Sequence, residues 1–114
     1  MAELVDLRQL PRAADLAPDE AAMAFAAVGS EPRLAVLLAL VRAGTGGLTT
    51  GELIERLDMP ASTLAHHLRS LDRGGVIRQQ KRGRFVQNRA SFDRIQSLAA
   101  FLLAECCADT GENC

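Results

Sequence analysis

Two short helical segments joined by a tight turn constrain the fold of this chain more than any other feature. Thr49 and Glu52 have the spacing of a capping box, which predicts that a short helix begins there. Residues 58–60, Asp-Met-Pro, form the turn, and residues 61–73 form a second helix. The inward-facing side chains of this second helix are Leu64, Leu68 and Leu71. Two short helices separated by three residues are the signature of a helix-turn-helix.

A basic β-hairpin is predicted directly after the second helix. Gly74-Gly75 ends the helix, and two β-prone runs, 76–80 and 84–88, flank a turn that contains Gly83. The turn itself is cationic, with Lys81 and Arg82 before the glycine. A hairpin with a basic tip that follows a helix-turn-helix is a wing.

The other segments predict three more helices. Pro18 opens a helix that Gly29 ends, and Ser30 is the N-cap of the next one. In this next helix the spacing predicts that Leu34, Leu37, Leu38 and Val41 all face the core. Ser91 caps a final helix, whose apolar stripe runs from Phe92 to Cys106. This stripe needs a partner, which is either the same helix of a second subunit or the chain's own core.

These elements predict a mainly α-helical domain with a small β-hairpin, in the order helix, helix, helix, helix, strand, strand, helix. The domain spans residues 18–105, preceded by an N-terminal arm over 1–17 and followed by a cysteine-containing tail over 106–114. The first residues lack a basic stretch followed by an apolar run, and no apolar stretch is long enough for a membrane span. We therefore expect a cytoplasmic protein without a membrane partner.

The charge of the chain is divided unevenly. The net charge is −1, yet residues 62–94 contain eight basic and two acidic residues, so this segment carries +6 and the remainder −7. Such asymmetry favours a localised anionic partner, for which phosphate is the usual chemistry. The residues expected to contact DNA are Ser62, Thr63, His66, His67 and Arg69 on the second helix, and Lys81, Arg82 and Arg84 on the wing. Either histidine could make the DNA contact, and we expect one of the two to be partly buried.

All three cysteines lie within the last nine residues, at Cys106, Cys107 and Cys114. Three thiolates are suited to a thiophilic ion such as As(III) or Sb(III), because soft sulfur ligands select soft ions. A regular helix would separate Cys106 from Cys107, so a three-thiolate site requires the helix to fray near Cys107, with Gly111 providing freedom for the chain to turn back. The sequence leaves open whether such a site lies within one subunit or between two.

Three stretches carry a family resemblance: Ser30-Glu-Pro-Arg33-Leu34, then Ser62-Thr-Leu-Ala-His66-His67-Leu68-Arg-Ser-Leu71 with Gly74-Gly75-Val76-Ile77, and Lys81-Arg82-Gly83-Arg84. Together they resemble the ArsR/SmtB family of bacterial metal-sensing repressors over residues 19–105. The resemblance implies a winged-helix homodimer that binds an inverted repeat in double-stranded operator DNA. It also implies that transcription is repressed until an inducer binds.

Two metal sites known in that family are missing from this chain. Residues 48–53 contain no cysteine where the founding arsenic repressors have a Cys-x-Cys motif. Of the zinc ligands on the last helix only Asp93 is present, since Ile95 cannot bind a metal and no histidine follows His67. The C-terminal trio instead resembles a third arrangement, an As(III) site made by a Cys-Cys pair at the end of the last helix and one later cysteine. The resemblance thus implies As(III) or Sb(III) as inducer.

The same sequence features are compatible with other functions. The same fold could sense thiol oxidation or reactive sulfur through a bond between Cys114 and the vicinal pair, or another thiophilic ion such as Cd(II), Pb(II) or Hg(II). A winged helix that binds protein instead of DNA is a second alternative, which the basic segment disfavours. No Gly-rich phosphate loop, paired carboxylates or Ser/His/Asp set is present, so we expect neither enzymatic activity nor an organic cofactor.

Overall fold

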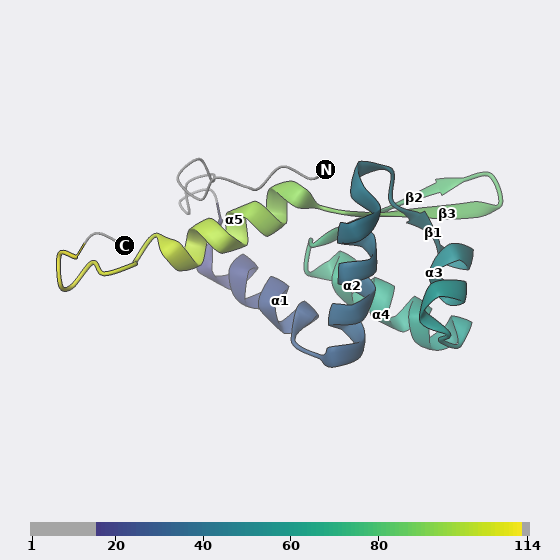
Figure 1. Cartoon of the computed structure of the whole chain (residues 1–114), viewed down its shortest axis with the longest axis horizontal. Coiled ribbons are helices and arrows are strands. Elements are labelled where there is room, and N and C mark those ends of the chain that lie inside the picture. Colours follow the sequence, from purple (N-terminus) through teal and green to yellow (C-terminus); the bar gives the residue numbers. More distant parts are fainter. Residues whose placement is uncertain (1–15, 113–114) are drawn as a thin grey trace.

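The computed structural model describes residues 16–112. In this range the elements are α1 (Pro18–Val28), α2 (Glu31–Ala43), the 3-10 helix η3 (Gly44–Gly46), β1 (Leu48–Thr49), α3 (Thr50–Leu57), α4 (Ala61–Arg73), β2 (Ile77–Arg82), β3 (Phe85–Ala90) and α5 (Phe92–Leu103). Figure 1 shows the hairpin at one end of the ribbon and the segment after α5 at the other. The predicted order of helices and the predicted hairpin are confirmed.

The sheet has one strand more than the sequence predicted. β1 pairs antiparallel with β3, which also pairs with β2, so the strand order is β1-β3-β2. Gly47 precedes β1 with a φ of 69°, and a Cβ at this position would collide with the backbone carbonyl of Asn88. A strand of two residues is too short to show an alternating pattern, which is why the sequence did not reveal it.

The predicted caps of α2 and α3 are formed. The Ser30 hydroxyl accepts a hydrogen bond from the Arg33 amide at 3.2 Å. Thr49 Oγ1 accepts from the Glu52 amide at 3.1 Å, and Glu52 Oε1 accepts from the Thr49 amide at 3.0 Å. The backbone hydrogen bond from Thr49, followed by its side-chain hydrogen bond, lowers the pKa of Glu52. Ser91 is the N-cap residue of α5, but its side chain makes no capping hydrogen bond.

The Arg33 side chain caps the C-terminal end of α1. Its Nε donates to the carbonyl of Ala27 at 2.6 Å, and its Nη2 donates to the carbonyl of Ala26 at 3.2 Å. The last carbonyls of a helix have no partner within it and carry partial negative charge, which a guanidinium neutralises. Arg33 therefore fixes the angle between α1 and α2.

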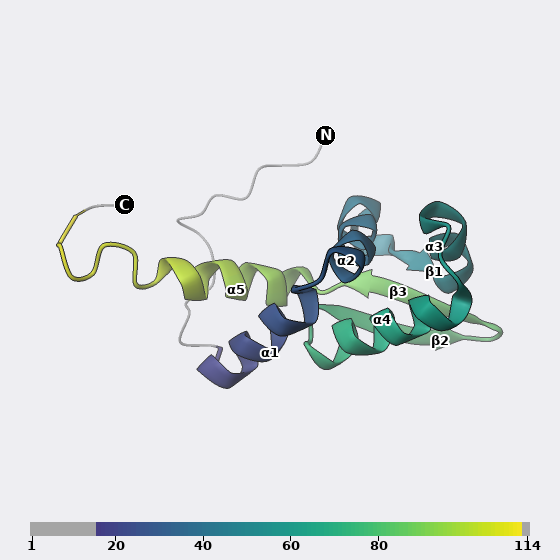
Figure 2. The same ribbon diagram turned by 90° about the horizontal axis from the view of Figure 1, so that it is seen from below.

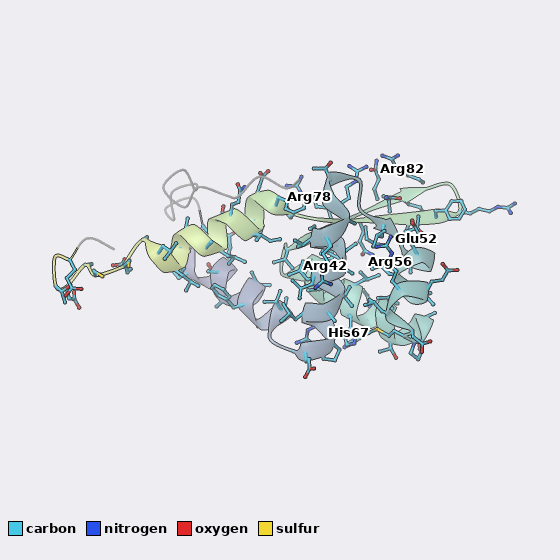
Figure 3. All side chains as sticks on the ribbon, in the orientation of Figure 1. Arg42, Glu52, Arg56, His67, Arg78 and Arg82 are labelled. Carbon is cyan, nitrogen blue, oxygen red and sulfur yellow. The ribbon has the colours of Figure 1, made fainter. Side chains whose placement is uncertain are left out.

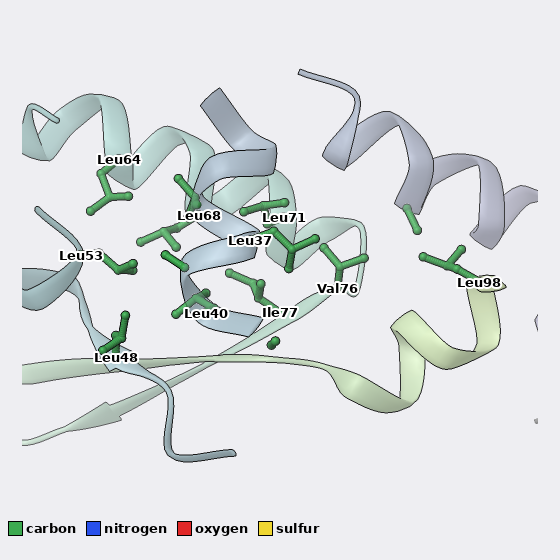
Figure 4. Packing of buried hydrophobic residues seen from close by; sticks show 14 of the residues in the cluster. Leu37, Leu40, Leu48, Leu53, Leu64, Leu68, Leu71, Val76, Ile77 and Leu98 are labelled. Carbon is green, nitrogen blue, oxygen red and sulfur yellow. The ribbon is translucent and has the colours of Figure 1, made fainter. Parts of the chain in front are cut away.

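One aliphatic core joins α2, α3, α4 and the sheet, as Figure 4 shows for Leu37, Leu40, Leu53 and Leu68. The predicted core face of α2 was partly wrong. Leu37 is buried, but Leu34 and Leu38 are 42% and 39% exposed, and Val36 and Leu40 occupy the core instead. Helical spacing predicted the apolar face of α2. It does not specify which part of this face is buried by other residues of the same chain.

No single helix in residues 16–112 is long and apolar enough to span a membrane. Only α1 taken together with α2 and η3 reaches the required length, and this pair is bent by 99° at its break. Several apolar side chains of the pair, among them Ala24, Val36 and Leu40, are buried in the core.

Candidate nucleic-acid interface and cysteine tail

Helix α4 presents its polar side to solvent. Leu64, Leu68 and Leu71 anchor it in the core. The side chains of Ser62, Thr63, His66 and Arg69 are exposed. Pro60 precedes the helix and has no side chain that could cap it, so the first backbone amides stay available to an anion. The exposed side chains and the uncapped N-terminus fit the prediction that α4 contacts DNA, which stays a prediction.

His67 differs from its neighbour. His66 is exposed, whereas His67 is half-buried and its Nδ1 is buried without a hydrogen-bond partner in the described part of the chain. The two rings are tilted, with centroids 5.9 Å apart. Burial lowers the pKa of His67, and the positive charges of His66 and Arg33 lower it further. The expectation that one histidine is partly buried is confirmed, and His66 is the one whose ring is accessible to DNA.

The wing carries its cations at the tip. Lys81, Arg82 and Arg84 are exposed, and Arg82 Nη2 donates to Gln80 Oε1 at 3.4 Å. Phe85 lies opposite Arg82 across the hairpin and is 66% exposed. Phe85 was not among the residues predicted to contact DNA, although a phenylalanine next to a basic turn is a visible signal in the sequence. The tip therefore presents one aromatic ring among three cations.

The base of the wing is tied to α3 by a buried amide. Asn88 is fully buried, and its Nδ2 donates to the Leu48 carbonyl at 3.2 Å and to Thr50 Oγ1 at 3.1 Å. Its Oδ1 accepts from Gln79 Nε2 at 2.9 Å. These bonds join β2, β3, β1 and the first residue of α3. Asn88 thereby holds the wing at a fixed angle to the helix-turn-helix, a role that only the strand register reveals.

The two parts of the predicted DNA surface face the same end of the molecule. The N-terminal end of α4 and the hairpin tip both lie at the end away from the C-terminal tail (Figures 1 and 2). The labelled Arg82 lies on the wing and His67 on α4 (Figure 3). The residues predicted to contact DNA on the wing and on α4 therefore lie at one end of the molecule, which we call the DNA-facing end.

The tail leaves the helix earlier than predicted. α5 ends at Leu103, so Cys106 lies beyond the helix and is exposed, and the prediction that it belongs to the apolar stripe was wrong. Residues 104–111 form turns, with positive φ at Cys107 and Gly111. Loss of the helix removes the regular geometry that would have separated the two adjacent thiols.

The two adjacent sulfur atoms lie close together. Cys106 Sγ is 3.7 Å from Cys107 Sγ. Cys106 has a free thiol, whereas Cys107 is disulfide-bonded. The third predicted ligand, Cys114, lies outside the described residues, and residues 16–112 contain no group of three or more His, Cys, Asp or Glu that could hold a metal ion. The three-cysteine site thus stays a prediction.

Large apolar side chains are exposed on three helices. They are Met23 and Phe25 on α1, Leu34 and Leu38 on α2, and Leu102 and Leu103 on α5. Leu102 is 62% exposed, which is a high value for a leucine on a helix that its sequence predicts to be amphipathic. The single chain leaves these apolar side chains open to solvent.

Residues 28–80 match the family model of a helix-turn-helix domain. An uncharacterised HTH-type transcriptional regulator of Methanocaldococcus jannaschii is 34% identical over 65 residues, which are 57% of this chain and 71% of that protein. The family model covers α2, α3, α4 and the first residues of β2, and it ends before the wing tip.

Solved structures extend the similarity to most of the chain. An ArsR family transcriptional regulator is 26% identical with a TM-score of 0.71, covering 85% of this chain and 97% of the other. An ArsR-like transcriptional regulator from Rhodococcus sp. RHA1 is 30% identical with a TM-score of 0.67, covering 80% and 82%. A homodimeric winged helix-turn-helix DNA-binding domain from Mycobacterium bovis has the same fold, with 23% identity, a TM-score of 0.61 and coverage of 99% and 94%.

Proposed function

Because this chain belongs to the ArsR family of winged helix-turn-helix transcriptional regulators, we propose that it is a repressor whose inducer is As(III) or Sb(III), bound by Cys106, Cys107 and Cys114. DNA binding and transcription regulation follow from the family, whose members are regulators and not enzymes. The identity of the inducer is the proposed step. The observation that carries it is the concentration of all three cysteines in the last nine residues.

The tail has the chemistry that a trivalent thiophilic ion needs. Such an ion takes three thiolates, and the first two sulfur atoms are already 3.7 Å apart outside the helix. Each thiol loses its proton when it binds the ion as a thiolate. In the reduced protein all three sulfur atoms are available for this purpose.

A second copy of the chain is the expected partner of the exposed apolar side chains on α1 and α5. Met23 and Phe25 on α1, and Leu102 and Leu103 on α5, are the side chains that such a copy would cover. The related Mycobacterium bovis domain is homodimeric. A two-fold dimer would place its two α4 helices about 34 Å apart, one turn of DNA, and would bind an inverted repeat.

Helix α5 connects the proposed ion site in the tail to the wing. It starts at Phe92, two residues after the last residue of β3, and ends three residues before Cys106. Ion binding would reorganise the end of the helix that the second copy packs against. A change in the spacing of the two α4 helices would then weaken operator binding, which requires a differential affinity of only about 1–3 kcal/mol.

Fluorescence anisotropy of the reduced protein on the DNA upstream of its own gene tests this proposal. Tight binding that low arsenite releases is the expected result. Cys107→Ser should bind the operator as tightly as the unmodified protein and stay bound with arsenite, because one of three ligands is gone. Ala104→Ser is the matched control on the same exposed segment and should be released normally. Release of the Cys107→Ser protein by arsenite would rule out the three-cysteine site.

A thiol redox switch is the second candidate, and the disulfide at Cys107 favours it. Oxidation of two thiols forms one disulfide and delivers two electrons and two protons to the oxidant, for example hydrogen peroxide, which becomes water. Release from DNA by peroxide without arsenite, reversed by dithiothreitol, would support this candidate. Indifference to both peroxide and arsenite would direct the search to Cd(II), Pb(II) or Hg(II) in the same assay.

A further inference from the structure

Two arginines face each other at the base of the wing. Arg78 on β2 and Arg89 on β3 are directly paired in the antiparallel register, so their side chains stand on the same face of the sheet. Directly opposite residues have Cβ atoms about 4.5–5.5 Å apart, and like charges in this position destabilise a sheet. A negatively charged group near both guanidinium groups would compensate this repulsion.

No residue in the described part of the chain supplies that compensation. Neither Arg78 nor Arg89 forms an ion pair or a hydrogen bond through its side chain with residues 16–112. The Nε of Arg89 is moreover buried without a partner. A buried N–H without an acceptor is costly, and more so when it belongs to a charged group. Arg94, by comparison, is paired with Glu20 at 3.4 Å.

Both arginines line an open pocket of about 290 Å³. The pocket lies between η3, the base of the hairpin and the start of α5, and its other polar lining residues are Thr45, Ser91 and Asp93. Figure 3 labels Arg78 at the end of the hairpin next to α5. Since a water molecule occupies about 30 Å³ of liquid, the pocket has room for a small polyatomic ion with its remaining water.

The charge in the pocket favours an anion. Two guanidinium groups outweigh the one carboxylate of Asp93, and the first turn of α5 adds its free amides and partial positive charge. The Ser91 side chain, which makes no capping bond, is free to donate to a ligand. Guanidinium groups bind oxyanions in a bidentate manner, and this geometry suits phosphate and carboxylate.

We propose that the pocket between Arg78, Arg89 and the start of α5 is a binding site for an oxyanion of the phosphate type. The ligand is either a small free anion or compound carrying a phosphate group, or a phosphate of the DNA backbone. An anion in this pocket would bridge β2, β3 and α5, the strands of the wing and the helix assigned to the dimer. The site is independent of the cysteine tail, so it stands or falls separately from arsenic sensing.

Calorimetric titration with inorganic phosphate, at constant pH and ionic strength and in chloride as the background, tests the free-ion source. Arg78→Gln and Arg89→Gln should each weaken phosphate binding by about tenfold or more. Arg73→Gln, which removes an exposed arginine from the end of α4, is the charge-matched control and should leave it unchanged. Arg78 is exposed, so its variant remains informative if loss of the partly buried Arg89 impairs folding.

A second measurement serves as a check on the first. Phosphate stabilises many proteins because it is excluded from their surface, so the increase in Tm is compared between the unmodified protein and the variants. The increase should be smaller in both pocket variants than in Arg73→Gln. This comparison removes the general salt effect from the result.

Operator binding in chloride buffer distinguishes the two sources. If phosphate ions do not bind but each pocket variant lowers the slope of log affinity against log salt by about one, the site holds a DNA phosphate. If phosphate ions bind and operator affinity in chloride is unchanged, the site holds a free anion. Pocket variants that match Arg73→Gln in phosphate affinity, Tm increase and salt slope would overturn the proposal.

Discussion

The two ends of this molecule are held together in different ways. At the DNA-facing end, Leu64 and Leu68 fasten α4 in the core, and Asn88 makes hydrogen bonds to residues 40 and 38 positions away in sequence. In the described part of the tail, the hydrogen bonds join residues no more than four positions apart, as from Gly111 to Cys107. Long-range packing preorganises the first end, whereas local hydrogen bonds alone shape the described part of the second.

The largest test of this difference compares two leucines. Leu68→Ala should lower the free energy of unfolding by about 2–5 kcal/mol, because the side chain is only 2% exposed and its removal leaves a cavity. Leu102→Ala, at the other end, should cost less than about 0.5 kcal/mol in the single chain. Urea denaturation at several protein concentrations separates the contribution of a dimer to the Leu102 result. Equal losses for both variants at the lowest concentration would contradict the contrast.

A smaller effect is expected from the hydrogen bonds. Asn88→Ala leaves the Leu48 carbonyl, the Thr50 hydroxyl and the Gln79 amide without their partner, at a cost of about 1–3 kcal/mol. Thr110→Val removes an exposed tail hydrogen bond to the Cys107 carbonyl and should change stability by less than about 0.5 kcal/mol. Thermal unfolding of the two variants measures both values. A Thr110→Val loss as large as that of Asn88→Ala would mean that the tail is packed as firmly as the wing.

Charge at the two ends should affect DNA binding unequally. Arg84→Gln removes an exposed wing-tip cation and should reduce the slope of log operator affinity against log salt by about one. Glu112→Gln changes the charge by one unit of the opposite sign in the tail and should leave the slope unaltered. Anisotropy titrations at several salt concentrations between about 50 and 200 mM measure the slope for both variants. A normal slope for Arg84→Gln would remove the wing tip from the DNA interface.

The smallest effect concerns pH. The pKa of His67 is lowered mainly by burial, so below about pH 6.5 the unfolded chain takes up a proton that the folded chain resists. Stability should therefore fall as pH drops from 7.5 through this range, and it should stay flat above it. His67→Gln should reduce this dependence, while His66→Gln, at the exposed neighbour, should reduce it less. Identical Tm profiles for His67→Gln and the unmodified protein would show that His67 does not contribute.

Local signals in the sequence predicted the DNA-facing end well. The helix starts were predicted from Thr49 with Glu52 and from Ser30 before Pro32, because a cap depends on residues that are three positions apart. Periodic leucines placed the buried side of α4 correctly. These features require only information within one or two turns of a helix, which a single sequence contains.

Features that depend on distant parts of the chain were missed or wrong. Burial of Asn88 and the pairing of Arg78 with Arg89 follow from strand register, which no local pattern specifies. The exposure of Leu34 and Leu38 depends on which surfaces the chain covers with its own residues. Early termination of α5 could not be seen either, because Ala104, Glu105 and both adjacent cysteines do not in themselves end a helix.

Gly47 affects how genetic data on this protein should be interpreted. A side chain at this position would displace β1 from β3 by colliding with the Asn88 carbonyl, although Gly47 is not among the residues expected to contact DNA. In a screen for mutants that have lost DNA binding, we expect substitutions at position 47 to be recovered alongside those in α4 and the wing. Such a screen therefore recovers residues that hold the DNA-contacting surface in place as well as residues that contact DNA. Measurements of stability and DNA binding on purified variants distinguish the two groups.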